Sequence, residues 1–99
     1  MAERVAVIGG GISGLATALA LLDAGIGADL YEHADRIGGR IGTSPFAGVA
    51  HVDEGPDAFL ARVPEAVALA HRVGLGDDLV SPEAVGAMVW HHGLHTIPD

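Results

Sequence analysis

The sequence predicts an α/β fold that begins with a β-α-β unit, and three observations support this. The continuous apolar segment at residues 5–8 is typical of a buried parallel strand. A run of glycines follows and leads into a helical pattern at residues 12–24, which Gly25 and Gly27 end. Residues 28–31 then have the pattern of a second short strand, which ends at Glu32. Strand, helix and strand in this order are typical of an α/β fold.

The rest of the chain predicts a hairpin, a helix and a second hairpin. Proline at its first position and glycine just after its end delimit the helix. The expected elements are residues 41–46 paired with 49–52 across Ala47 and Gly48, the helix at residues 64–73, and residues 85–90 paired with 94–97. The chain stops directly after the last expected strand, which would leave sheet edges and apolar faces uncovered. We therefore expect a fragment of a longer protein.

Composition excludes several classes of function. The 99 residues carry 13 acidic side chains against five arginines and no lysine, a formal net charge of −8. Nucleic acids and anionic membranes require clustered positive charge, so neither partner is expected. The absence of cysteine excludes a disulfide scaffold and any cysteine-ligated metal. Hydrophobic residues make up 49% of the chain, enough for a core, and we expect a soluble, cytoplasmic protein.

The uncharged run at residues 5–22 resembles a signal peptide or a short membrane span. Gly9, Gly10 and Gly11 lie in its middle, however, and would destabilise a helix by roughly 1 kcal/mol each. A strand, a turn and a helix explain the run better, so no transmembrane segment is expected.

Two further patterns predict no chemistry. Ser13 lies in a glycine-rich turn, but Leu15 occupies the position where a nucleophile elbow has its last glycine. His91, His92 and His95 invite a metal site, but neighbouring residues on a strand point to opposite faces. We expect no metal, and no residue of the chain is a candidate catalytic base.

The main motif is the glycine-rich turn between the first strand and the first helix. Gly9, Gly11 and Gly14 satisfy G-x-G-x-x-G, and Glu32 follows at the end of the second strand. In this context Gly9 permits the turn, Gly11 lets the backbone approach a pyrophosphate, and Gly14 lets the helix pack closely. The helix N-terminus would face the phosphates, and Glu32 would bind a ribose. The motif predicts dinucleotide binding; an ordinary tight turn is the alternative.

A second glycine pair favours FAD over NAD. Gly38 and Gly39 follow Glu32 closely and lie between Arg36 and Arg40. An extended dinucleotide that continues past the first helix needs a second glycine-lined passage, and a guanidinium there can neutralise its phosphates. An ordinary turn with solvated arginines is the alternative. We therefore predict FAD as the cofactor.

These motifs resemble a known family. Residues 5–14, Glu32 and residues 36–40 are similar to segments of the amine-oxidase-type FAD flavoproteins. The segment EGPDAFLAR, at residues 54–62, resembles more specifically the oxygen-dependent porphyrinogen oxidases of bacterial haem synthesis. Residues 93–98 resemble the strand with which those enzymes enter their substrate domain. The resemblance covers essentially the whole chain, and only the N-terminal part of a much longer family protein.

The resemblance implies a Rossmann-like FAD-binding domain, begun by residues 1–84, and the truncated start of a substrate-binding domain at residues 85–99. It implies oxidation of coproporphyrinogen III or protoporphyrinogen IX to the porphyrin, with molecular oxygen as acceptor. Membrane association or a homo-oligomer would depend on later residues, and this fragment alone would be inactive. The implied FAD contacts are Gly9, Gly10, Gly11, Ile12, Ser13, Gly14, Glu32, His33, Arg40, Gly55, Pro56, Asp57 and Ala58.

Arg62 is a candidate for substrate binding, because a guanidinium there could bind a propionate group; a surface charge before a helix is the alternative. Other hypotheses remain open. The shared motifs fit an amine oxidase or a carotenoid desaturase equally well. A non-catalytic escort-type protein on the same scaffold is a third hypothesis, which Glu32 and Arg40 disfavour.

Overall fold

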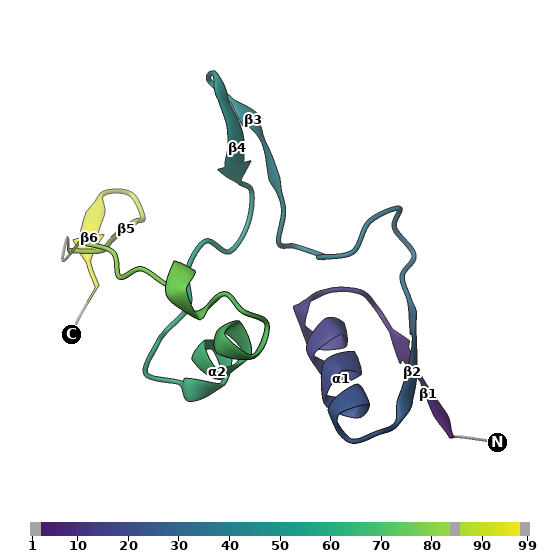
Figure 1. Ribbon diagram of the computed structural model, residues 1–99. Coiled ribbons are helices and arrows are strands. Elements are labelled where there is room, and N and C mark those ends of the chain that lie inside the picture. The colour runs from purple at the N-terminus through teal and green to yellow at the C-terminus, as the bar shows by residue number, and fades with distance from the viewer. Residues whose placement is uncertain (1–2, 84–85, 98–99) are drawn as a thin grey trace.

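The computed structural model describes residues 3–83 and 86–97, and within them three separate two-stranded sheets (Figure 1). β1 and β2 are parallel neighbours, whereas β3–β4 and β5–β6 are antiparallel hairpins. The predicted α/β class and the predicted order of elements are confirmed. In chain order the elements are β1 (Arg4–Ile8), α1 (Ile12–Asp23), β2 (Gly27–Tyr31), β3 (Thr43–Phe46), β4 (Val49–Asp53), α2 (Pro64–Arg72), the 3₁₀ turn η1 (Gly76–Asp78), β5 (Met88–Trp90) and β6 (Leu94–Thr96).

The β-α-β unit forms the N-terminal part of the molecule, from Arg4 to Tyr31. The register pairs Arg4 with Gly27 at one end of the parallel sheet and Ile8 with Tyr31 at the other. α1 lies over one face of this sheet (Figure 1). It ends at Asp23, and Gly25 then adopts a left-handed conformation (φ +75°) that glycine accepts at no steric cost.

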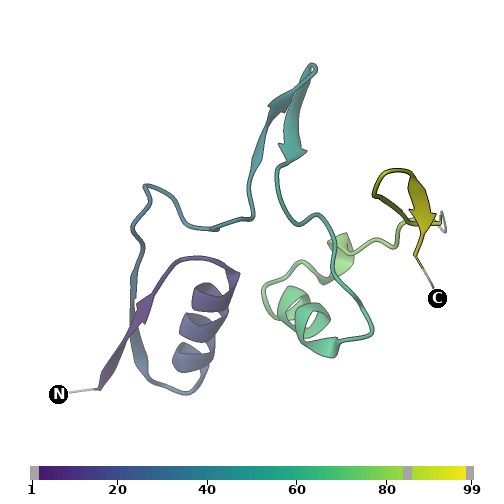
Figure 2. The ribbon, with the colours of Figure 1, turned by 180° about the vertical axis from the view of Figure 1, so that it is seen from behind.

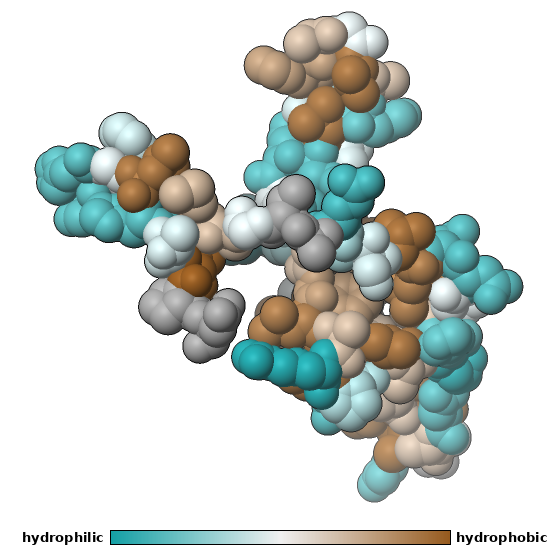
Figure 3. Space-filling view, turned by 90° about the vertical axis from the view of Figure 1, so that its left-hand side faces the viewer, coloured by the Kyte–Doolittle hydropathy of each residue, from teal (hydrophilic) through white to brown (hydrophobic). Residues whose placement is uncertain are grey.

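The expectation of a buried first strand and of a substantial core is wrong for the described residues. Val7 is the one buried hydrophobic side chain among them, while Val5 is 39% and Ile8 80% exposed. A two-stranded sheet with a helix on one face leaves its other face and both edges open. Hydrophobic side chains accordingly lie at the surface in Figure 3. The Cα radius of gyration is 17.6 Å, compared with about 13 Å for a compact domain of 100 residues.

The β3–β4 hairpin projects from the rest of the molecule in both ribbon views (Figures 1 and 2). It turns at Ala47 and Gly48, as predicted, with φ values of 48° and 83° that match the twist of the flanking strands. β3 begins at Thr43 and not at the predicted residue 41. The reason is that the Ile41 backbone belongs to the preceding turn, where its N–H donates to the Gly38 carbonyl (3.1 Å).

The β5–β6 hairpin turns at His92, with a φ of 51°, and Gly93. His91 and His92 lie in this turn and not on the strand, so their rings meet edge to face with centroids 4.5 Å apart. The predicted start of the strand at residue 85 and the predicted domain boundary between residues 84 and 85 lie outside the described residues. Of the described helices, none has the length and apolar character needed to cross a membrane.

Candidate functional site

The first glycine turn connects β1 to α1. Gly9 has a φ of +98°, and its N–H donates to the Tyr31 carbonyl (2.7 Å), which extends the parallel pairing into the turn. Gly11 is the N-cap of α1, and the helix has neither a side-chain cap nor an acidic residue in its first turn. The partial positive charge of this helix end is therefore left for an anion.

Gly14 and Gly11 are glycines for different reasons. A Cβ on Gly14 would overlap the Gly9 carbonyl oxygen and would lie 3.6 Å from the Val7 side chain, so the close packing of α1 on the sheet requires glycine there. Gly11 has an ordinary extended conformation (φ −77°, ψ −177°). A Cβ on Gly11 would meet only the Gly39 Cα, at 4.0 Å. The described chain itself therefore leaves room for a side chain at Gly11.

The second glycine turn packs against the first. The Gly38 N–H donates to the Gly10 carbonyl (2.7 Å). Gly38 and Gly39 have φ values of +111° and +60°, and a Cβ on Gly39 would lie 3.2 Å from the Gly11 Cα. A Cβ at residue 39 would therefore crowd the first turn, and the two positive φ values also favour glycine.

Glu32 binds the first turn and the residues directly after β2. Its Oε2 accepts a hydrogen bond from the Gly10 N–H (2.7 Å), and its Oε1 accepts one from the Ala34 N–H (2.8 Å). The backbone N–H groups of Ala34 and Gly10 hold the pKa of the Glu32 carboxyl below its ordinary value. Each carboxylate oxygen can accept a second hydrogen bond, so these contacts leave capacity for a ribose hydroxyl.

A third segment lies beside the second turn. The Glu54 N–H donates to the Gly42 carbonyl (2.9 Å). A Cβ on Gly55 would overlap the Arg40 carbonyl oxygen, so the two backbones are in close contact. The segment of residues 55–58 is thereby held next to Arg40.

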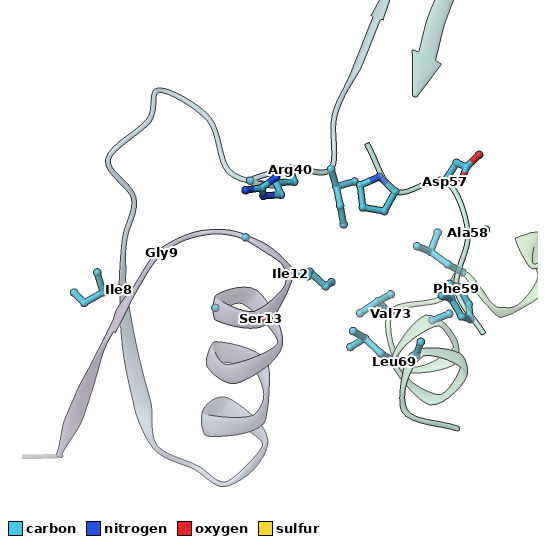
Figure 4. A pocket seen from close by; sticks show the side chains of 18 residues that line it. Ile8, Gly9, Ile12, Ser13, Arg40, Asp57, Ala58, Phe59, Leu69 and Val73 are labelled. Carbon is cyan, nitrogen blue, oxygen red and sulfur yellow. The ribbon is translucent and has the colours of Figure 1, made fainter. Parts of the chain in front are cut away.

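The three segments and α2 enclose a cavity of about 870 Å³ (Figure 4). Figure 4 shows Ile12 pointing from the start of α1 toward Leu69 of α2 and Val73, which directly follows α2. Of the predicted site residues, those that line the cavity are Gly9, Gly11, Ile12, Ser13, Gly14, Arg40, Pro56, Asp57 and Ala58. The sequence predicted the helix but not that α2 forms a wall of this cavity. The apolar face of a helix shows that it packs against something, but it does not show which segment.

Five predicted site residues do not line the cavity. Gly10 and Glu32 bond to each other beside it, and Gly55 supports Arg40 through its backbone. His33 is exposed and Arg62 is exposed as well. Arg62 also lies outside the neighbouring cavity of about 760 Å³ that Asp57 and Phe59 help to line. A role for Arg62 in substrate binding stays a prediction.

The arginines differ in their partners. Arg4 binds Asp29, Arg72 binds Asp23, and Arg36 binds backbone carbonyls. Within the described part of the chain, Arg40 makes no hydrogen bond or ion pair, and it lines the cavity. The Arg40 guanidinium is therefore available to bind an anionic ligand beside the uncapped N-terminus of α1. No group of three or more acidic or histidine side chains suited to a metal occurs in the described residues.

The sequence is similar to those of known proteins. The pattern of the flavin-containing amine oxidoreductase family matches residues 12–96. Coproporphyrinogen III oxidase of Mycobacterium tuberculosis (strain H37Rv) is 38% identical over 97 residues, which cover 93% of this chain and 21% of that protein. Zeta-carotene desaturase of Zea mays is 35% identical over 80 residues, which cover 81% of this chain and 14% of that protein.

A solved structure has the same fold. The crystal structure assigned as a protoporphyrinogen oxidase from Exiguobacterium sp. 255-15 superposes with a TM-score of 0.80 at 34% identity, covering 99% of this chain and 22% of that one. The first curated relatives are likewise much longer, since the chain spans only 15% to 21% of their length.

The hydrogen bonds of Glu32 predict a pH dependence of stability. Its pKa is lowered in the folded protein, so its contribution is fully present above its ordinary pKa of 4.5 and is lost as the pH falls through the lowered value. The free energy of unfolding of the wild type should therefore exceed that of Glu32→Gln at neutral pH, and the difference should shrink in acid. Urea unfolding at several pH values measures this. A difference that stays constant from about pH 7 to about pH 3 would refute the assigned hydrogen bonds.

Proposed function

Because this chain belongs to the family of flavin-containing amine oxidoreductases, as its motifs predict, we propose that it forms the first part of the FAD site of a porphyrinogen oxidase. The complete enzyme would oxidise a porphyrinogen to the porphyrin, with molecular oxygen as the acceptor. Residues 1–84 would belong to the FAD-binding domain, and residues 85–99 would begin the substrate-binding domain.

The cofactor proposal rests mainly on the conformation and surroundings of Gly11. Its backbone conformation is open to any residue, and a Cβ there would meet no protein atom closer than 4.0 Å. A glycine that the described chain does not need is explained by a ligand that approaches the backbone closely. The uncapped α1 N-terminus and the free Arg40 guanidinium lie at the same cavity, and both favour an anionic ligand. A pyrophosphate meets all three conditions.

Different residues of the site would bind different parts of FAD. N–H groups at the start of α1 and the Arg40 guanidinium would bind the pyrophosphate, and Glu32 would bind the adenosine ribose. Leu69 and Val73 give the opposite wall of the cavity an apolar surface that limits the access of water. When bound, FAD supplies the capacity to accept hydride equivalents from the substrate. We assign no catalytic acid or base to these residues.

The substrate proposal has a narrower basis. It rests on the segment at residues 54–62 and on the relatives named as porphyrinogen oxidases. The chain carries a net charge of −8. A substrate with several carboxylates would therefore find most of its basic partners outside these residues, with Arg62 as one candidate within them. A carotenoid desaturase is the second candidate, because zeta-carotene desaturase of Zea mays matches 81% of the chain.

The substrate proposal predicts a specific activity. The full natural polypeptide that contains these residues should convert a colourless porphyrinogen into a fluorescent porphyrin and consume oxygen as it does so. Parallel assays distinguish a porphyrinogen oxidase from a carotenoid desaturase and from an amine oxidase. The substrates are coproporphyrinogen III, protoporphyrinogen IX, zeta-carotene and, as the amine, putrescine. A flavin-containing protein that leaves both porphyrinogens unchanged would exclude the substrate proposal and retain the cofactor proposal.

The two glycines at the start of α1 form a matched pair of variants. Gly11→Ala should weaken FAD binding by about tenfold or more, because its Cβ would separate the backbone from the pyrophosphate, while the stability of the flavin-free protein falls by less than about 1 kcal/mol, the effect of a poorer N-cap residue. Gly14→Ala should lower that stability by about 1–3 kcal/mol, because its Cβ overlaps the Gly9 carbonyl. FAD titration and thermal unfolding measure the two effects.

The contrast between the variants is decisive. If Gly11→Ala bound FAD as tightly as the wild type, the pyrophosphate would have to lie elsewhere. If Gly11→Ala lost as much stability as Gly14→Ala, its glycine would have a structural cause, and the main support for the cofactor proposal would be removed.

A further inference from the structure

Arg36 has contacts unlike those of the other arginines. Its Nη1 donates to the carbonyls of Ile37 (3.1 Å) and Ile41 (3.2 Å), and its Nη2 donates to the carbonyl of Gly39 (2.8 Å). All three acceptors belong to the second glycine turn and the residues that flank it. The guanidinium is thus bound on the inside of this turn, where three carbonyl oxygens converge on one cation.

The glycines around Arg36 make room for it. A Cβ on Gly42 would lie 3.0 Å from Nη2, and a Cβ on Gly38 would lie 3.1 Å from Nη1. Gly38 is also the residue whose N–H donates to the Gly10 carbonyl. The contact between the two turns and the binding of the guanidinium therefore share a residue.

Binding these carbonyls has a consequence on the other side of the turn. In a trans peptide the N–H and the C=O point in opposite directions. Because the Gly39 carbonyl points to Arg36, the N–H of Arg40 in the same peptide points away from Arg36. Gly39, Arg40 and Ile41 line the cavity of about 870 Å³. A carbonyl oxygen turned into that cavity would repel a phosphate, whereas an N–H attracts it.

We propose that Arg36 is a positioning residue for phosphate binding: it holds three carbonyl oxygens of the second glycine turn away from the cavity, so that Arg40 presents its backbone N–H group and a free cation to the pyrophosphate. This inference rests on the proposed FAD site. Arg36 itself is not among the residues that line the cavity, and its guanidinium donates to the protein backbone.

Arg36 and Arg40 therefore have separate tasks. Arg40 acts through its charge, because its guanidinium has no partner among the described residues. Arg36 acts through the geometry of its planar fork, whose donors reach several acceptors at once. A lysine at residue 36 would keep the charge but could not bridge the same three carbonyls.

Competition binding tests this inference. The full natural polypeptide is freed of flavin, and FAD, ADP and adenosine are then titrated separately against the wild type, Arg36→Gln and Arg36→Lys. Arg4→Gln is the control, because it removes an exposed arginine that binds Asp29, away from the glycine turns. Adenosine retains the ribose that Glu32 would bind but lacks phosphates, so it also reports whether a variant is folded.

Both Arg36 variants should bind FAD and ADP about tenfold or more weakly than the wild type, while adenosine binds equally to all four proteins. Arg4→Gln should match the wild type for every ligand. Wild-type affinity in Arg36→Lys would show that charge suffices and would overturn the inference. So would an equal loss for adenosine and ADP, which indicates a general structural role.

The failure of this inference is distinguishable from that of the proposed function. A wild type that takes up FAD, together with Arg36 variants of unchanged affinity, contradicts the positioning role alone. A wild type that binds neither FAD nor ADP contradicts the proposed function as well.

Discussion

The backbone of Gly10 is the point on which the rest of the site depends. Its carbonyl accepts the N–H of Gly38, and its N–H donates to Glu32, each over 2.7 Å. These bonds join two turns that are far apart in the sequence and fix the second turn against the start of α1. The second turn carries Arg40, and the Arg40 backbone contacts Gly55, from which the chain continues to α2. The walls of the cavity are thus linked back to the backbone of one residue, Gly10.

Much of this arrangement was predictable, because local rules determine it. Glycine spacing between a strand and a helix determines the first turn, Ala47 and Gly48 determine a hairpin, and Pro64 begins a helix. Contacts that join distant segments were not predictable. Glu32 suggests a ribose ligand by its place in a motif, but nothing in the pattern indicates that its oxygens also accept backbone N–H groups. The acceptors of Arg36 were missed because backbone carbonyls carry no signal in the sequence.

Burial was predicted wrongly for a related reason. An apolar strand indicates that something should cover it, but it does not indicate that the same stretch of chain supplies the cover. The contact between α1 and α2 is an example of weak cover. The two helices contact each other through the ion pair of Asp23 and Arg72, whose side chains are 49% and 56% exposed. Such pairs contribute only about 0–1 kcal/mol. The spacing of the two helices therefore depends largely on the glycine turns and on whatever fills the cavity between them.

The most direct test of this account is the flavin content of the full natural polypeptide that contains these residues. The purified protein should be yellow, with the absorption spectrum of oxidised flavin, and denaturation should release FAD in an amount close to one molecule per chain. A colourless protein that gains no thermal stability when FAD is added would contradict the account, because the paired glycine turns and Arg40 would then have no dinucleotide to bind.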